Sequence, residues 1–389
     1  MSGRALFCQP RRIRRGATLT LVFAGVLVAG AATGSFPESA RPERKIAVGP
    51  VGAATRHEAV QKAAAEAMAD GKSPTEAAER AVSRSGDRWG AVYSESEYEE
   101  FRQALDGSYT GVGLWARLEP DGRIEVTKVR PGSPAADAGI RRGDRLRSVD
   151  GSEVDGRPVT EVIALLRGDA EDAPAGTTVT LGLQRGKRAW TEKLRRARLS
   201  TDSVTDRRLT GGVTVIKIAA FTKGTADAVR AALRAAPAEA GIVLDLRGNS
   251  GGLVTEAVDT ASSFLDGGLV ATYDIEGAQR SLHAAAGGDT ARPLVTLVDG
   301  GTMSAAELLT GALQDRGRAV VIGSRTFGKG SIQMPTKLPD GSVAELTVGH
   351  YRTPSGHAVD GRGITPDLEA GAGALERAET VLTGLGDPS

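Results

Sequence analysis

The sequence predicts an α/β multidomain protein with an N-terminal helical region, a small β-rich domain, and an α/β core of parallel strands with crossover helices. Two observations carry this prediction. Strand-like and helix-like segments alternate over about residues 213–323, which is typical of a parallel sheet with crossover helices. Before them, short strands and two helical segments follow one another within about ninety residues. A chain of 389 residues is long enough for two or three domains.

The N-terminus has the pattern of an export signal or a membrane anchor. Five arginines precede an uncharged apolar run over residues 16–32, which is a little short for a bilayer span of roughly 20 residues. We therefore expect an exported protein, either secreted or held in the cell envelope by residues 16–32. Cys8 is the only cysteine and precedes this run, so neither a disulfide nor a catalytic cysteine is expected in the exported part.

The remaining chain divides by composition and periodicity. Pro, Gly and charged residues mark a linker, and Ser73 and Ser94 are placed as N-caps of helices. A net charge of +1 gives no reason to expect nucleic acid as a partner. The expected parts are a signal or anchor (1–33), a linker (34–54), the helical region (55–108), the β-rich domain (109–199), the core (200–373), and a C-terminal helix and tail (374–389).

Two glycine-rich loops follow predicted core strands. The loop RGNSGG follows the strand IVLDL, and DGGTMS follows PLVTLV. Ligands of parallel sheets bind at the carboxyl ends of the strands, where both loops are expected to lie. Gly251 and Gly252 offer consecutive N–H groups suited to an oxyanion hole. A phosphate-binding loop is the alternative, but the Lys-Ser/Thr of that pattern is missing.

Ser304 opens a predicted helix directly after the second loop, where a nucleophile would be exposed at the edge of the sheet. The alternative is that Ser304 is an N-cap, with Glu307 completing a capping box. A serine nucleophile needs a base. Lys329 lies 25 positions later, between two glycines. It can act as a base only if burial or cationic neighbours lower its pKa. The alternative is that Lys329 is a solvated surface charge. Gln333 lies four residues after Lys329. On a straight strand the two side chains would point to the same face, but their Cα atoms would be roughly 13 Å apart.

Metal chemistry has no support in the histidine pattern. The four histidines have no metal-ligand spacing with another cluster of ligands, so we expect no metal. They are His57, His283, His350 and His357.

Five motifs occur in one order between about Ser94 and Glu369. In order and spacing they resemble the carboxyl-terminal processing proteases, also called tail-specific proteases, of the serine/lysine type. The resemblance implies that Ser304 is the nucleophile, Lys329 its base and Gln333 the residue that orients the lysine amine. The motifs are EYEEFRQALDGSYTGVGL, VRPGSPAADAGIRRGDRLRSVDG, IVLDLRGNSGGL, MSAAELLTGALQDRGRAVVIGSRTFGKGSIQ and GHYRTPSGHAVDGRGITPDLE.

The resemblance also assigns the supporting groups. The N–H of Ala305 and one from Gly251 or Gly252 would hold the oxyanion. Two departures from the family pattern remove no reacting group: Ala306 replaces a frequent second serine, and GNSGG replaces an Asn-Asn-Pro loop. We expect Asp315 to have a structural role at the helix end. The β-rich domain looks like a PDZ domain, whose carboxylate-binding loop would be Gly111, Val112, Gly113 and Leu114.

The function that the resemblance implies is an exported serine endopeptidase that cleaves proteins near their C-termini. Its partners would be proteins or peptides with free C-termini, and it would need no metal or organic cofactor. Two other hypotheses remain: a PDZ-bearing scaffold with an inactive protease fold, and a Ser-His hydrolase that uses His350 or His357. The sequence carries no signal for a particular oligomeric state.

Overall fold

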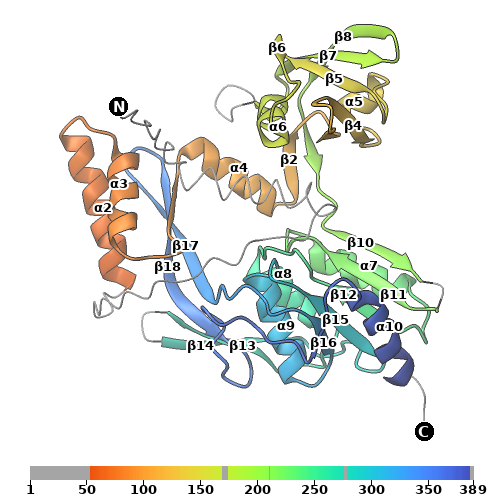
Figure 1. The fold of residues 1–389 in the computed structure, drawn as a ribbon. Helices are drawn as coiled ribbons and strands as arrows, with labels where there is room; N and C mark the ends of the chain where they lie inside the picture. The colour runs from red at the N-terminus through yellow and green to blue at the C-terminus, as the bar shows by residue number, and fades with distance from the viewer. Residues whose placement is uncertain (1–52, 169–173, 210, 276–277, 386–389) are drawn as a thin grey trace, which may run out of the picture.

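The computed structural model describes residues 53–168, 174–209, 211–275 and 278–385 (Figure 1). The expected export segment and Cys8 lie outside the described residues, as does most of the expected linker. Within the described ranges, no helix combines the length and the apolar character that crossing a bilayer requires.

A six-stranded sheet forms the base of the core, in the order β10-β11-β12-β15-β16-β19. Every pair from β11 to β19 is parallel, which confirms the prediction from the alternation of strands and helices. Only β10, at one edge, pairs in the antiparallel sense. The strands are β10 (Val204–Arg208), β11 (Thr214–Ile218), β12 (Ile242–Asp245), β15 (Leu294–Val298), β16 (Val320–Gly323) and β19 (Leu368–Glu369).

Helices cover both faces of this sheet (Figure 1). Successive strand residues point to opposite faces. Ile216 and Ile218 therefore pack into the apolar cluster with α7, α8 and α9, while Val215 packs into the cluster with α10. The expected C-terminal helix thus belongs to the packed core. The helices are α7 (Thr225–Ala235), α8 (Val254–Ala261), α9 (Ala305–Asp315) and α10 (Ala374–Leu385).

A second sheet, which the sequence did not predict, is antiparallel and five-stranded. Its central strand β18 pairs with β17 along one edge and with β1 and β13 along the other. Because β1 comes from the N-terminal region, the pairing of β1 with β18 connects that region to the core by backbone hydrogen bonds. The strands are β1 (Ala91–Tyr93), β13 (Leu269–Ile275), β14 (Ala278–His283), β17 (Ser331–Lys337) and β18 (Val343–Arg352).

The N-terminal region contains three described helices besides β1. Ser73 and Ser94 cap the second and third of them, as predicted, and Ser94 forms a full capping box with Glu97. The first two helices share an apolar cluster with β18, to which Val60 and Leu346 contribute. The helices are α2 (Ala53–Ala69), α3 (Pro74–Arg84) and α4 (Glu95–Leu105).

The small β-rich domain lies apart from the core sheets and is joined to the rest of the chain by the paired strands β2 and β9 (Figure 1). It has its own apolar cluster and a sheet in the order β3-β4-β5-β7-β8, so β3 is an edge strand. Its elements are β2 (Ser108–Gly111), β3 (Leu114–Leu118), β4 (Ile124–Val129), α5 (Pro134–Asp137), β5 (Arg145–Val149), β6 (Ser152–Glu153), α6 (Val159–Arg167), β7 (Thr178–Arg185), β8 (Arg188–Arg195) and β9 (Ala197–Ser200).

Candidate active site

Ser304 occupies a strained turn between β15 and α9. Its φ of 53° and ψ of −119° lie in a region that residues with a side chain rarely adopt. Such a conformation costs about 1–3 kcal/mol and persists only where the surroundings enforce it. A similar sharp strand-to-helix turn presents the nucleophile at the sheet edge in other hydrolases. The backbone at Ser304 therefore has a geometry suited to an exposed nucleophile.

The loop after β12 lies directly against this turn. Gly251 has a φ of +99°, and a Cβ there would lie 2.9 Å from the Cβ of Ser304 and 3.2 Å from the nitrogen of Ala305. The N–H of Gly251 donates to Oδ1 of the buried Asn249 at 2.8 Å. In the part of the chain that the structure describes, the N–H groups of Gly252 and Ala305 have no assigned hydrogen bond. Two amides next to the serine are therefore available to a ligand.

Glu307 connects the serine turn to the loop that carries Lys329. This carboxylate is fully buried in the first turn of α9. Its Oε2 accepts from the N–H of Ser304 at 3.0 Å and from the N–H of Lys329 at 2.8 Å. Its Oε1 accepts from the N–H of Gly328 at 2.7 Å and from the Thr326 hydroxyl. A single side chain thus sets the relative positions of the two predicted reacting residues.

Burial raises the pKa of the Glu307 carboxyl, while these four hydrogen bonds oppose that shift. One half of the predicted capping box of Ser304 and Glu307 is formed, because the Glu307 carboxylate accepts from the N–H of Ser304. The N–H of Glu307 donates to the carbonyl oxygen of Ser304 at 2.8 Å, and among the described residues it has no assigned hydrogen bond to the Ser304 hydroxyl. A second bridge comes from β18, where the Tyr351 hydroxyl lies 2.9 Å from the carbonyl oxygen of Ser304 and 3.3 Å from that of Lys329.

The Lys329 side chain is partly buried and lies against an aromatic ring. Its Nζ lies 5.3 Å from the ring centroid of Trp89, which comes from the loop between α3 and β1. Burial lowers the pKa of Lys329, and the charges of Glu345 and Asp87 oppose that shift. Because desolvation disfavours the ammonium form, burial makes the neutral amine that a general base requires easier to reach than it is for a lysine in water.

Gln333 lies on β17 after a bulge between Ile332 and Gln333. Its Nε2 donates to Ser331 Oγ at 2.8 Å and approaches Thr347 Oγ1 at 3.4 Å. Within the described residues, no hydrogen bond links Ser304 Oγ, Lys329 Nζ and the Gln333 side chain. The structure therefore brings the backbones of the serine turn and the lysine loop together, but it does not connect the three side chains.

The other candidate residues lie in structural contacts. The Asp315 carboxylate accepts from the N–H of Ser355 at 2.8 Å. His350 lies 3.8 Å from Asp360, and His357 is paired with the carbonyl oxygen of Gly363. In the described ranges neither histidine is hydrogen-bonded to Ser304, and no three His, Cys, Asp or Glu side chains converge on a possible metal site.

The predicted carboxylate-binding loop lies beside a cavity of about 280 Å³. Val112 is buried, and Gly113 has a φ of +80°; a Cβ on Gly113 would lie 2.3 Å from the Cβ of Ser133. Among the described residues, the N–H groups of Val112 and Gly113 have no assigned hydrogen bond. The edge strand β3 and Leu166 of α6 line the cavity on one side, and Lys217 of the core lines it on the other.

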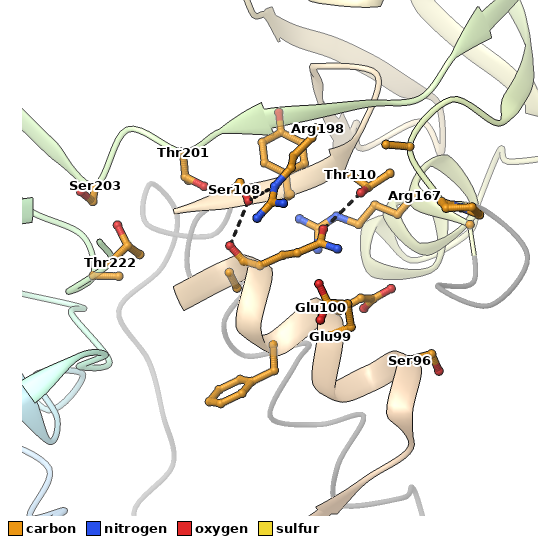
Figure 2. A pocket seen from close by; sticks show the side chains of 18 of the residues that line it. Ser96, Glu99, Glu100, Ser108, Thr110, Arg167, Arg198, Thr201, Ser203 and Thr222 are labelled. Carbon is orange, nitrogen blue, oxygen red and sulfur yellow. Dashed lines mark hydrogen bonds between the residues drawn. The ribbon is translucent and has the colours of Figure 1, made fainter. Parts of the chain in front are cut away.

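A second cavity, of about 410 Å³, lies between α4, the end of α6 and the core. Figure 2 shows Arg167 across this space from Glu99 and Glu100 of α4. Tyr109 and Arg167 line both cavities, and the Arg167 guanidinium lies 5.5 Å from the Tyr109 ring centroid. The floor includes Thr222, which directly follows the residue that bridges to Gly252. The two cavities therefore adjoin each other, and the second is lined by Thr222, the neighbour of the residue that bridges to the loop beside Ser304.

Several residues of this site were not predicted from the sequence. The sequence pattern predicts Glu307 only as part of a capping box, and Asn249 only as a member of a glycine-rich loop. Trp89 and Asp87 lie far from Ser304 in the sequence, so no local pattern connects them to it. Tyr351 belongs to a motif of the resemblance, but its position in that motif carried no chemical signal of its own.

Comparison with known proteins shows which families the chain matches. The profile of peptidase family S41 matches residues 212–370, and that of the PDZ domain matches residues 125–185. The chain is 35% identical over 315 residues to "Carboxyl-terminal-processing peptidase 3, chloroplastic" of Arabidopsis thaliana, which covers 76% of this chain and 60% of that protein. It is also 35% identical over 292 residues to a "Probable CtpA-like serine protease" of Staphylococcus aureus, covering 72% and 57%. The chain thus spans about three fifths of the length of these relatives.

Solved structures agree with the sequence comparison. The photosystem II D1 C-terminal processing protease is 28% identical with a TM-score of 0.50, and the match covers 84% of this chain and 97% of that one. An S41 structure from Bacteroides fragilis, 18% identical with a TM-score of 0.52, covers 81% and 91% and shares the fold. The protein therefore belongs to peptidase family S41 and combines the core of that family with a PDZ domain.

Proposed function

We propose that this protein is an exported serine endopeptidase that cleaves other proteins near their C-termini, with Ser304 as nucleophile and Lys329 as base. The observation that carries the proposal is the buried Glu307 carboxylate, which holds the backbones of these two residues on one oxygen atom. The strained turn at Ser304 and the lowered pKa of Lys329 support the same roles.

In the proposed reaction, the Ser304 hydroxyl gives its proton to the neutral amine of Lys329 as Oγ attacks the peptide carbonyl carbon. The N–H groups of Ala305 and Gly252 stabilise the oxyanion; Gly251 is the weaker candidate because its N–H is bound to Asn249. The Lys329 ammonium then protonates the leaving amine, and water hydrolyses the acyl-enzyme. Gln333 orients the lysine amine once the three side chains meet.

Tail recognition is the proposed role of the PDZ domain. The N–H groups of Val112 and Gly113, together with those of Gly111 and Leu114 in the same loop, form the proposed donor set for a terminal carboxylate. The peptide would add as a strand to the free edge of β3, next to α6. Such a substrate would pass from this groove through the two adjoining cavities, which share Tyr109 and Arg167, on its way to Ser304.

Export is proposed from the arginine-rich, then apolar, start of the sequence, with residues 16–32 as the signal or anchor. The names of the relatives support the activity: one is called a carboxyl-terminal-processing peptidase and the other a CtpA-like serine protease.

A fluorophosphonate probe tests the proposed chemistry directly, because it labels only an activated serine. We expect labelling of the wild-type protein and no labelling of Ser304→Ala or Lys329→Ala. A folded wild-type protein that does not react would favour the scaffold hypothesis. Loss of labelling in His350→Ala or His357→Ala, with Lys329→Ala still reactive, would favour the Ser-His alternative.

A further inference from the structure

The lysine of the proposed active site is in contact with a part of the chain that lies outside the S41 match. The loop between α3 and β1 carries Asp87, Arg88 and Trp89 between two glycines. Nζ of Lys329 lies 5.3 Å from the Trp89 ring centroid, and the same ring lies 5.6 Å from the ring of Phe327. Phe327 is 42% exposed, so this aromatic pair lies at the surface beside the serine turn.

Trp89 is fixed in place by an anchor on β18. Oδ1 of Asp87 accepts from the N–H of Trp89 at 3.1 Å and from that of Gly90 at 3.0 Å. The same carboxylate accepts from the N–H and the hydroxyl of Thr347, each at 2.7 Å. Because Thr347 also lies within 3.4 Å of Gln333 Nε2, the anchor is continuous with the strand that follows Lys329.

The indole nitrogen of Trp89 is buried and has no hydrogen-bond partner among the described residues. A buried donor without a partner is unfavourable, and such groups are rare in folded proteins. The ring position is therefore maintained by its other contacts, namely the Asp87 anchor, the Phe327 ring and the ammonium of Lys329. A cation on the face of a tryptophan is stabilised in its charged form.

We propose that Trp89 is a positioning residue that holds Lys329 as an ammonium on its ring face, out of hydrogen-bonding reach of Ser304, until the loop moves. The inference rests on the proposed role of Lys329 as the base. In the described state the lysine is bound to the ring, and within the described residues it has no hydrogen bond to the serine. Release from the ring frees the side chain and removes this stabilisation of the ammonium, so Lys329 can lose its proton to solvent and become the neutral amine that accepts the Ser304 proton.

Several charged groups lie around Lys329 and Trp89, and two of them shift the pKa of the lysine. Glu345 of β18 and Asp87 of the N-terminal loop favour the ammonium, as the ring does. Arg88, whose guanidinium lies 4.7 Å from the Trp89 ring centroid, contacts the same ring as Lys329. Glu307 of α9 binds the backbone N–H of Lys329. The variants chosen below leave Glu345, Arg88 and Glu307 unchanged.

The test compares two substitutions that differ only in the aromatic face. Trp89→Phe keeps a ring but removes the indole nitrogen, whereas Trp89→Met fills the space with a flexible apolar chain that has no ring. We expect the fluorophosphonate labelling rate of Ser304 at neutral pH to rise roughly 2- to 10-fold in Trp89→Met and to change less than about twofold in Trp89→Phe. The pH midpoint of labelling should fall in Trp89→Met only.

Asp87→Asn provides a second test: it weakens the anchor of Trp89 and also removes a negative charge that favours the ammonium of Lys329, so it should speed labelling for both reasons. Unfolding midpoints of all variants show whether they are folded. Equal labelling rates in Trp89→Met and Trp89→Phe, or slower labelling in Trp89→Met and Asp87→Asn than in the wild type, would overturn the inference. If Lys329→Ala still reacts with the probe, the proposed lysine base is wrong, and the inference about Trp89 is wrong as well. If Lys329→Ala is inert, the comparison of the Trp89 variants tests the inference separately from the proposed function.

Discussion

Replacing Glu307 with glutamine should lower the free energy of unfolding moderately, whereas replacing it with leucine should prevent the active site from forming. Glutamine keeps one oxygen and exchanges the other for an NH2 group. If the NH2 group takes the place of Oε1, it donates to the Thr326 hydroxyl, and the remaining oxygen still accepts from Ser304 and Lys329. Only the N–H of Gly328 then loses its acceptor.

The magnitude follows from the number of buried donors left without an acceptor. One unsatisfied backbone N–H costs about 1–3 kcal/mol, which is the expected loss for Glu307→Gln. Leucine offers no acceptor, so the N–H groups of Ser304, Gly328 and Lys329 all lose theirs, at a cost of about 3–9 kcal/mol. A natural domain has a total stability of about 5–15 kcal/mol, so the leucine variant should unfold locally or globally.

Urea unfolding and fluorophosphonate labelling measure the two consequences separately. Glu307→Gln should unfold at a lower urea concentration and still label, at a rate within about tenfold of the wild type. Glu307→Leu should not label. If Glu307→Gln is as unstable as Glu307→Leu, or if it is folded and inert, then the charge of Glu307 rather than its acceptor oxygens is what the site requires, and the reasoning is refuted.

Three further predictions concern the base and the tail-binding loop. Lys329→Arg should be as inert to the probe as Lys329→Ala, because guanidinium remains charged; near-normal labelling would contradict a lysine base. The labelling rate should rise with pH to a midpoint below the ordinary lysine pKa of about 10.4, since burial lowers the pKa of Lys329 and only its neutral form accepts a proton; a midpoint above that value would count against the assignment. Gly113→Ala should reduce kcat/KM for a long peptide with a free C-terminus, because its Cβ would collide with Ser133, while leaving probe labelling unchanged. An amidated peptide serves as the control, and equal losses for both peptides would argue against carboxylate recognition.

The parallel core could be predicted because its signals are local. Each buried strand and each amphipathic helix has its own periodicity, and the order of these segments already implies crossover connections. Ser304 and Lys329 could be proposed for a similar reason, since both lie in short motifs next to glycines. Their chemical roles, however, came from the resemblance and not from spacing alone.

The rest of the site depends on contacts between distant segments. Glu307 reaches Lys329 only because residues 324–330 fold back over the start of α9, and no sequence period records that loop path. The antiparallel sheet escaped prediction because β1 and β17 are short or partly exposed, so their patterns are weak. Asp87 and Trp89 act on Lys329 only after β1 pairs with β18.

The pairing of β1 with β18 also affects when the enzyme can first become active. Tyr93 pairs with Val343, so roughly 250 residues must be synthesised before the first strand of the antiparallel sheet meets its partner, and contacts of such separation form late. The lysine loop lies between these two strands in the sequence, and Tyr351 of β18 completes the bridge to Ser304. A nascent chain that has not yet reached β18 therefore lacks the assembled candidate site. If the proposed function holds, no reaction of Ser304 with a substrate is expected before β18 has been made and paired.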